Sequence, residues 1–209
     1  MDSNKIISIT SVIIAFIALG ISIYEIRESN KQSLFDRRLN AVLKIKCMKS
    51  LCDGNRTYYS RNFKDVDEPM PFVNNLFFRM TNTGLFEEIQ PLSSNIYDEK
   101  IKNKYLLKIE EMRNLCEEVI YIFSKDLGHS LSDFVYYYEE MLVSMYKYMV
   151  HISDLMNLCE QNNKEFPNND SYEEKLRKEM FRFIYGTFEL SERLFSEGIL
   201  RKAESKMRL

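Results

Sequence analysis

The chain has 209 residues, of which 45% are hydrophobic and 29% are charged, and its net charge at pH 7 is −2. These values are ordinary for a globular protein, and the length is enough for one hydrophobic core. Because 6 glycines and 4 prolines offer too few turns for an all-β fold, we predict an all-α protein with long helices.

The charges are distributed unevenly. Residues 25–50 contain seven Lys or Arg and three acids (+4), residues 201–209 contain four and one (+3), and residues 1–24 sum to zero, which leaves −9 for residues 51–200. Each Lys or Arg near an anionic membrane contributes roughly 1 kcal/mol. The pattern is typical of a protein that stands on a membrane, although ordinary solvated helix faces also explain it. The acidic body argues against a nucleic-acid partner.

Residues 6–24 form a run of nineteen residues without a charge. As a helix this run is roughly 28 Å long, close to the thickness of the hydrocarbon layer of a membrane. No second run of comparable length follows it. We therefore predict that residues 1–24 are a single transmembrane anchor.

A cleaved signal peptide is the alternative, with Lys5 as its basic end and Ala18-Leu19-Gly20 as its cleavage site. The apolar run continues beyond that site, however, and a basic cluster follows at once. Such a cluster stays on the cytoplasmic side, which predicts a bacterial inner-membrane protein with its N-terminus outside and its body in the cytoplasm. The residues predicted to contact lipid headgroups are Arg27, Lys31, Arg37, Arg38 and Lys44.

Small residues recur along the apolar run at steps of three and four. In lipid, helices associate through close backbone approach and interhelical hydrogen bonds, which Ser and Ala permit. We expect this face to pack on a second copy or on another membrane protein. Chance alignment of common residues and a polar pore in an oligomer remain alternatives. The face consists of Ser8, Ser11, Ala15, Ala18 and Ser22.

Residues 25–52 are predicted to continue the helix, because neither Gly nor Pro occurs there before Gly54. One amphipathic stripe marks this basic juxtamembrane helix, which we expect to pack on the body or on a copy of itself. The stripe consists of Phe35, Leu39, Val42, Ile45, Met48 and Cys52.

The segment "KQSLFDRRL" directly after the apolar run, together with a small helical body, resembles uncharacterised small single-pass bacterial membrane proteins. Some of those proteins are encoded near phage-defence or mobile-element genes. The resemblance covers residues 6–50 and implies a membrane location, but it assigns a role to no residue.

Residues 53–209 are predicted to form an antiparallel helical bundle, which has four or five helices when the juxtamembrane helix of residues 25–52, the stem, is counted. Asp53-Gly54-Asn55 indicates a turn that is followed by a loop to Pro71 and a helix over 71–82. Two long apolar stripes predict helices over 97–127 and 131–161, joined at Gly128-His129-Ser130. A last helix begins at Ser171 and contains Gly186 and Gly198, where close packing or a bend is expected.

The sequence contains no Gly-rich phosphate loop, no Glu-x-x-His pair for a di-iron site and no nucleophile motif. Cys47 and Cys52 lack the spacing of a zinc site, so four reduced thiols are expected. We therefore predict no metal, no cofactor and no enzymatic activity. The predicted function is that of a membrane-anchored interaction or sensor protein. The alternatives are a membrane-active effector whose assembled spans permeabilise the membrane, and a secreted helical binding protein.

Overall fold

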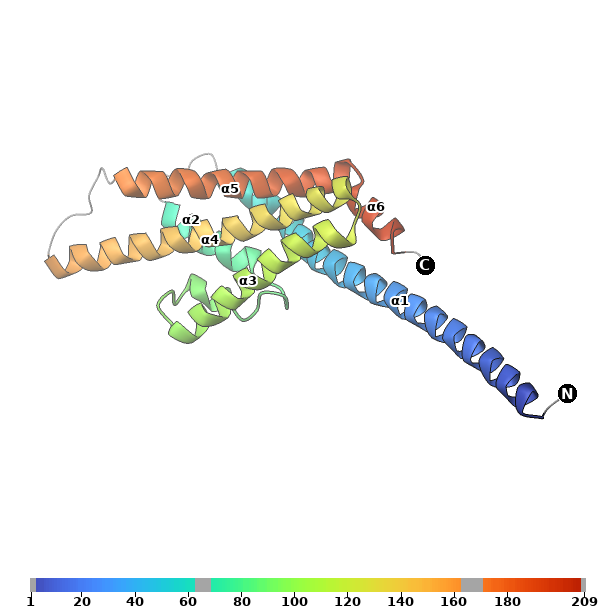
Figure 1. Cartoon of the computed structure of the whole chain (residues 1–209). Coiled ribbons are helices and arrows are strands. Elements are labelled where there is room, and N and C mark those ends of the chain that lie inside the picture. The colour runs from blue at the N-terminus through green and yellow to red at the C-terminus, as the bar shows by residue number, and fades with distance from the viewer. Residues whose placement is uncertain (1–2, 63–68, 163–170, 208–209) are drawn as a thin grey trace.

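A computed structural model describes residues 3–62, 69–162 and 171–207, with the side chains of residues 3–12, 62 and 69–71 outside this description. Within these ranges the protein is all-helical and has no strand, as predicted (Figure 1). The helices are α1 (Ser3–Asn62), α2 (Pro69–Met80), the short 3-10 helix η1 (Gln90–Ser93), α3 (Glu99–Ile122), α4 (Lys125–Asn162), α5 (Ser171–Ser196) and α6 (Ile199–Ser205).

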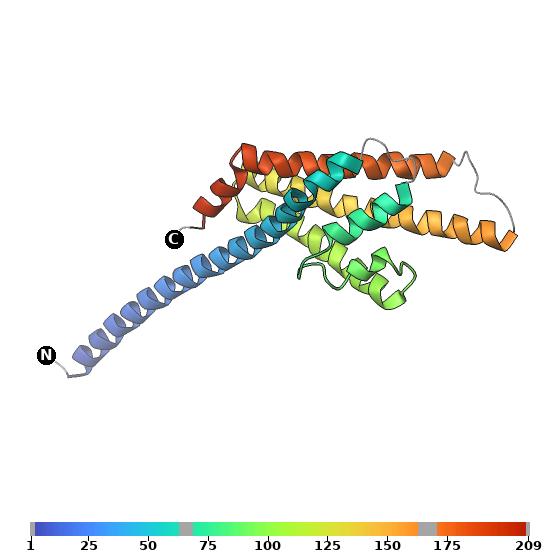
Figure 2. The ribbon, with the colours of Figure 1, turned by 180° about the vertical axis from the view of Figure 1, so that it is seen from behind.

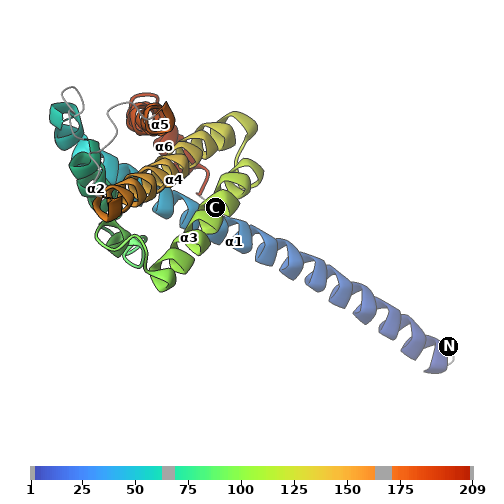
Figure 3. The same ribbon diagram turned by 90° about the vertical axis from the view of Figure 1, so that its left-hand side faces the viewer.

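Helix α4 is the centre of the bundle. It packs antiparallel to α3 on one side and to α5 on the other, and α2 crosses it (Figures 1 and 3). A helix covered on several sides needs an apolar face wider than a single stripe. The sequence predicted this width from Val135, Leu142, Met149 and Met156. The first three are buried, but the prediction is wrong for Met156, which lies near the end of α4 and is 50% exposed.

Helix α1 is one continuous helix of 60 residues, about 90 Å long. Its N-terminal half projects from the bundle, whereas its C-terminal half enters the core (Figures 1 and 2). The predicted packing of the stem on the body is therefore confirmed. The buried apolar residues of this part are Ala41, Val42, Ile45, Met48, Leu51 and Cys52.

The predicted turn at Asp53-Gly54-Asn55 is wrong, because α1 continues through these residues to Asn62. The side chain of Asn55 is buried and donates its amide to the carbonyl oxygens of Leu51, at 2.9 Å, and of Arg79, at 3.4 Å. A turn-forming residue is thus held in a helix by one hydrogen bond to the preceding turn of α1 and by one to α2, which only the folded protein can provide. These contacts offset the cost of about 1 kcal/mol that Gly54 adds relative to alanine.

The last four carbonyl groups of α2 have no partner within the helix itself. The backbone N–H groups of Thr81 and Asn82, just beyond it, donate to Phe77 O at 3.0 Å and to Arg79 O at 3.4 Å. Each of the four carbonyl groups also accepts a hydrogen bond from a side chain of α1, of α4 or of the segment after α2. This network explains why several polar side chains are buried in an otherwise apolar core. The donors and acceptors are Thr81 Oγ1 to Phe77 O (2.8 Å), Gln90 Nε2 to Phe78 O (3.4 Å), Asn55 Nδ2 to Arg79 O (3.4 Å) and Tyr138 Oη to Met80 O.

The connection between α3 and α4 lies at Phe123 and Ser124, not at the predicted Gly128-His129-Ser130. Phe123 is extended, with φ −111° and ψ 170°, and α4 begins at Lys125. Gly128 belongs to the first turn of α4, where its N–H donates to the Ser124 carbonyl at 2.7 Å. A Cβ atom on Gly128 would lie 2.8 Å from the Val119 carbonyl oxygen, so this glycine permits close approach of the two helices and does not form the turn.

The last predicted helix is divided into α5 and α6 at Gly198, whose φ of 66° is left-handed. This glycine provides the predicted bend and turns α6 back onto the bundle, where Ile199 and Ala203 are buried. The close packing predicted for Gly186 is also confirmed, since a Cβ atom there would lie 2.3 Å from the ring of Tyr137 on α4.

We expect Gly128→Ala to lower the free energy of unfolding by about 1–3 kcal/mol, because the added methyl group meets backbone atoms of α3 that cannot move independently. Gly54→Ala is the matched control. Its Cβ atom meets nothing within 4 Å, so alanine should stabilise α1 by about 1 kcal/mol. Chemical denaturation of the full chain in mild detergent, followed by circular dichroism, measures both. Equal effects of the two substitutions would contradict this description of the α3–α4 contact.

Candidate interaction surface

The projecting part of α1 exposes a continuous apolar surface. Every residue from 13 to 33 is exposed, and the large apolar side chains among them are between 44% and 69% exposed. Within the described part of the chain, no helix has an apolar stretch long enough to cross a membrane. The predicted anchor includes residues 1–12, whose side chains lie outside that part, so the anchor stays a prediction. The exposed apolar residues here are Ile13, Ile14, Phe16, Ile17, Leu19, Ile21, Ile23, Tyr24 and Ile26.

Three members of the predicted association face lie on the exposed helix, namely Ala15, Ala18 and Ser22. The Ser22 hydroxyl donates to the Ala18 carbonyl, one turn earlier in the same helix, at 3.0 Å. This bond keeps the hydroxyl close to the helix surface and satisfies its proton without a partner chain. Ser8 and Ser11 belong to the predicted face but lie outside the described side chains.

The five basic residues predicted to contact lipid have different environments. Arg27 and Lys44 are exposed. Lys31 forms an ion pair with Glu28 at 2.8 Å within α1, and Arg37 forms one with Glu118 of α3 at 2.7 Å. Arg37 therefore also links the stem to the bundle, which the sequence did not indicate. Contact of these residues with lipid stays a prediction.

Arg38 lies at the point where α1 leaves the bundle. Its Nε donates to the carbonyl oxygen of Ile122 at 2.7 Å, and its Nη1 donates to that of Lys206 at 2.9 Å. These carbonyl groups end α3 and α6, so one cation caps the negative ends of two helices. The guanidinium also lies 5.7 Å from the ring centre of Phe123. Arg38 thus joins α1, α3 and α6 at one position.

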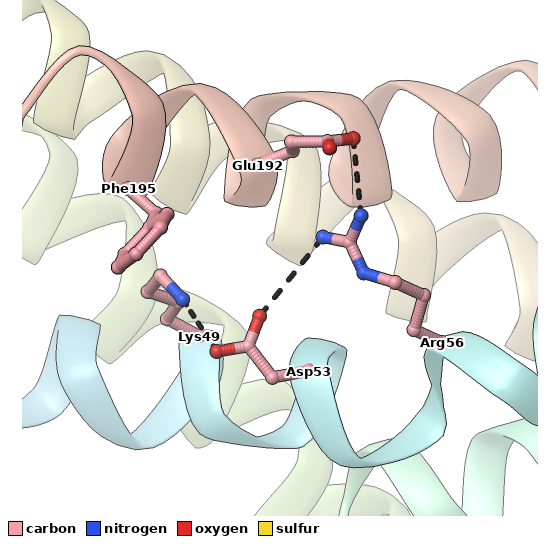
Figure 4. Close-up of a pocket in the computed structure, with 5 residues that line it drawn as sticks. All are labelled: Lys49, Asp53, Arg56, Glu192 and Phe195. Carbon is pink, nitrogen blue, oxygen red and sulfur yellow. Dashed lines mark hydrogen bonds and ion pairs between the residues drawn. The ribbon is translucent and has the colours of Figure 1, made fainter.

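A polar pocket of about 350 Å³ lies between α1 and α5 (Figure 4). Arg56 of α1 pairs with Glu192 of α5 at 3.0 Å and approaches Asp53 at 4.0 Å. Lys49 pairs with Asp53 and lies 5.4 Å from the ring centre of Phe195. Because each charge faces an opposite one, the arrangement leaves little net charge for a ligand. Among these ion pairs, only the exposed Arg56–Glu192 pair joins α1 to α5, and such a pair contributes little to stability.

The pocket continues along the same two helices into a second hollow of about 360 Å³, which shares Arg56 and Glu192. Tyr59 stacks on Phe188 there, with ring centres 4.3 Å apart. The sequence did not predict this contact between α1 and α5. The i,i+4 spacing of Lys49 and Asp53 indicates an ion pair on one face of a helix. The turn predicted at Gly54, however, placed Arg56 outside that helix.

No disulfide joins Cys47, Cys52, Cys116 and Cys159. Burial raises the pKa of Cys52 to about 12 and that of Cys116 to about 12, so both stay protonated at neutral pH. Across the described ranges, no group of three His, Cys, Asp or Glu side chains could hold a metal ion.

Glu139 of α4 is a buried carboxylate, with 1% of the residue exposed. Arg113 of α3 donates to it at 2.8 Å, but the guanidinium itself is largely exposed. Burial raises the pKa of Glu139, and the neighbouring Arg113 counteracts this only in part. The raised pKa means that the folded state binds this proton more tightly than the unfolded state does. As the pH rises and Glu139 loses its proton in the folded state, the free energy of unfolding therefore falls.

Comparison of the chain with protein-family models, with curated proteins and with solved structures found no match.

We expect Glu139→Gln to be as stable as the wild type or more stable at pH 7, because the substitution removes a buried charge while exposed Arg113 remains solvated. The difference in unfolding free energy should grow in favour of the variant as the pH rises above 4.5, the ordinary pKa of this carboxyl, and should level off once Glu139 is ionised, since only the wild type loses stability in this step. Denaturation curves across this pH range measure the difference. Glu140→Gln removes the same charge from a half-exposed position and is the control. A Glu139→Gln variant that loses stability relative to the wild type as the pH rises would contradict this role of Glu139.

Proposed function

We propose that this protein is a membrane-anchored helical interaction or sensor protein that associates with itself or with another membrane protein. The observation that carries the proposal is the continuity of α1. The same helix holds the uncharged run of residues 6–24 in its projecting part and packs into the bundle core with residues 41–52. Movement or pairing of the projecting part is thereby coupled to the bundle without a flexible linker.

The apolar surface of the projecting part supports a lipid environment. Burying a large apolar side chain contributes roughly 1.5–3 kcal/mol, so leaving a row of them in water is costly. A contiguous exposed surface of this kind marks a membrane or protein contact. Together with the uncharged side chains of residues 6–12, it gives a helix of the length needed for one crossing.

The basic residues after the run support an inside position for the bundle. Arg27 and Lys31 follow the apolar segment within seven residues of Tyr24, and Arg37 and Arg38 come next. Clusters of Lys and Arg near the end of a membrane helix remain in the cytoplasm. We therefore propose a bacterial inner-membrane protein with its N-terminus outside, whose partners include the membrane lipids.

The small-residue face supports association of the span. Lipid tails are as apolar as a leucine side chain, so large apolar residues give a second helix no preference for protein over lipid. Ala15 and Ala18 let a neighbouring backbone approach, whereas Ile13 and Ile17 lie on the opposite side of the helix.

We expect the full chain expressed in bacteria to remain in the membrane after alkaline extraction with its N-terminus intact. A reporter that is active only in the cytoplasm should be active when fused to the C-terminus. Soluble protein cleaved after Gly20, with activity of an export-dependent reporter, would contradict the anchor and favour a secreted binding protein. Loss of membrane potential upon induction would instead favour the membrane-active effector.

We also expect disulfide crosslinking between copies in the membrane for Ala15→Cys and Ala18→Cys. The background carries serine at Cys47, Cys116 and Cys159 and keeps the buried Cys52. Ile13→Cys and Ile17→Cys are the controls, because they lie in the same part of the helix but on the side opposite the small-residue face. Dimer bands on a gel should be several times stronger for the alanine positions. Equal crosslinking at all four positions would mean that the helix has no specific face.

A further inference from the structure

We propose that α6 and the adjoining surface of α1 form a basic docking surface for the anionic lipids of the cytoplasmic leaflet, which holds the bundle down on the membrane. The proposal rests on the membrane anchor proposed above. Most of the positive charge that meets the lipid comes from α6, and less of it comes from residues 25–52 of α1.

The fold brings the two basic segments of the sequence to the same end of the molecule. Gly198 turns the chain so that α6 lies beside the point where α1 leaves the bundle, and the C-terminal end of α6 points to the side on which α1 projects (Figures 1 and 2). Buried Ile199 and Ala203 fix α6 to the core. The bond from Arg38 to the Lys206 carbonyl holds its far end against α1 at 2.9 Å.

The positive charges of α6 are free to meet an external anion. Glu204, the one acidic residue of this helix, forms an ion pair with Lys46 of α1. Among the described residues, no carboxylate lies within ion-pair distance of Arg201, Lys202 or Lys206, and all three are exposed. In the stem, by contrast, the charges of Lys31 and Arg37 are offset by Glu28 and Glu118.

The distances allow contact with headgroups. The uncharged run ends at Tyr24 and the first half-buried residue of α1 is Leu34, so about 15 Å of helix separates the run from the bundle. Membrane helices tilt by about 20° on average, and attraction acts over roughly 10 Å at 0.1 M salt. The charge of −9 on residues 51–200 is repelled by an anionic leaflet, so the bundle turns its basic end toward the membrane.

An engineered tryptophan tests the proposal in the full chain, because the protein contains none of its own. Ser205→Trp places the probe on α6, and Gln161→Trp places it at the far end of α4 as the control; both positions are exposed. The proteins are reconstituted into vesicles that contain brominated phosphatidylcholine, which quenches tryptophan near the bilayer, with or without phosphatidylglycerol.

We expect quenching of the α6 probe only in vesicles that contain phosphatidylglycerol, with loss of the quenching in 1 M salt, where the Debye length falls to about 3 Å. The far probe should not be quenched. Each of the charges of Arg201, Lys202 and Lys206 should contribute about fivefold to the ratio of docked to undocked protein. The triple variant Arg201→Gln, Lys202→Gln, Lys206→Gln should therefore lose the quenching. The variant Lys100→Gln, Lys102→Gln, Lys147→Gln, with the same change of charge elsewhere, should retain it.

An unquenched α6 probe in vesicles with phosphatidylglycerol would overturn the proposal, and so would quenching that the triple variant retains. Flotation of the same samples in a density gradient separates this failure from failure of the anchor. Protein that floats with the vesicles without quenching is anchored but not docked. Protein that does not float contradicts the anchor and with it this proposal.

Discussion

Helix α1 has no break between its projecting and its buried part, and this continuity determines the rest of the structure. A helix that passes from the core to the outside without a loop must leave the bundle in the direction that the core packing gives it. The contacts of Ile45, Met48 and Cys52 therefore set the orientation of residues thirty positions earlier in the chain. Whatever surrounds the projecting half, its position relative to α3 and α6 is fixed by side chains of the other half.

Hydrogen bonds to helix ends complete what the apolar contacts begin. The last turn of α2 is covered by side chains from three parts of the chain, among them Asn55 and Tyr138. An unsatisfied buried carbonyl costs roughly 1–3 kcal/mol, so these bonds favour one arrangement of α1, α2 and α4 over shifted ones that bury similar apolar area. Close contacts at Gly128 and Gly186 act in the same direction, because only glycine allows α3 and α5 to approach α4 at those positions.

The sequence predicted the helices and most of the core, because a repeat of 3.6 residues identifies a buried helix face without knowledge of its partner. It misplaced the α3–α4 connection, since Gly128 and Ser130 resemble a turn as much as Ser124 and Asp126 resemble a helix start. It ended α1 too early at Gly54, because the weak local preference for a turn was outweighed by the burial of Asn55 and by its hydrogen bond to Arg79 of α2. The role of Arg38 and the pairing of Arg56 with Glu192 could not be predicted, because both join residues far apart in sequence. The small residues of α1 could be recognised from their spacing, but spacing does not say what covers them.

The two hydrogen bonds of Arg38 also restrict how α1 can turn. Neighbouring residues of a helix point about 100° apart, so rotation of α1 by the step of a single residue would swing the guanidinium away from both the Ile122 and the Lys206 carbonyl groups. Twisting the projecting half about its own axis therefore meets resistance from two helix ends at once. Tilting of the projecting half can leave both bonds in place. The two bonds of Arg38 therefore oppose rotation of α1 about its axis more than they oppose bending of α1.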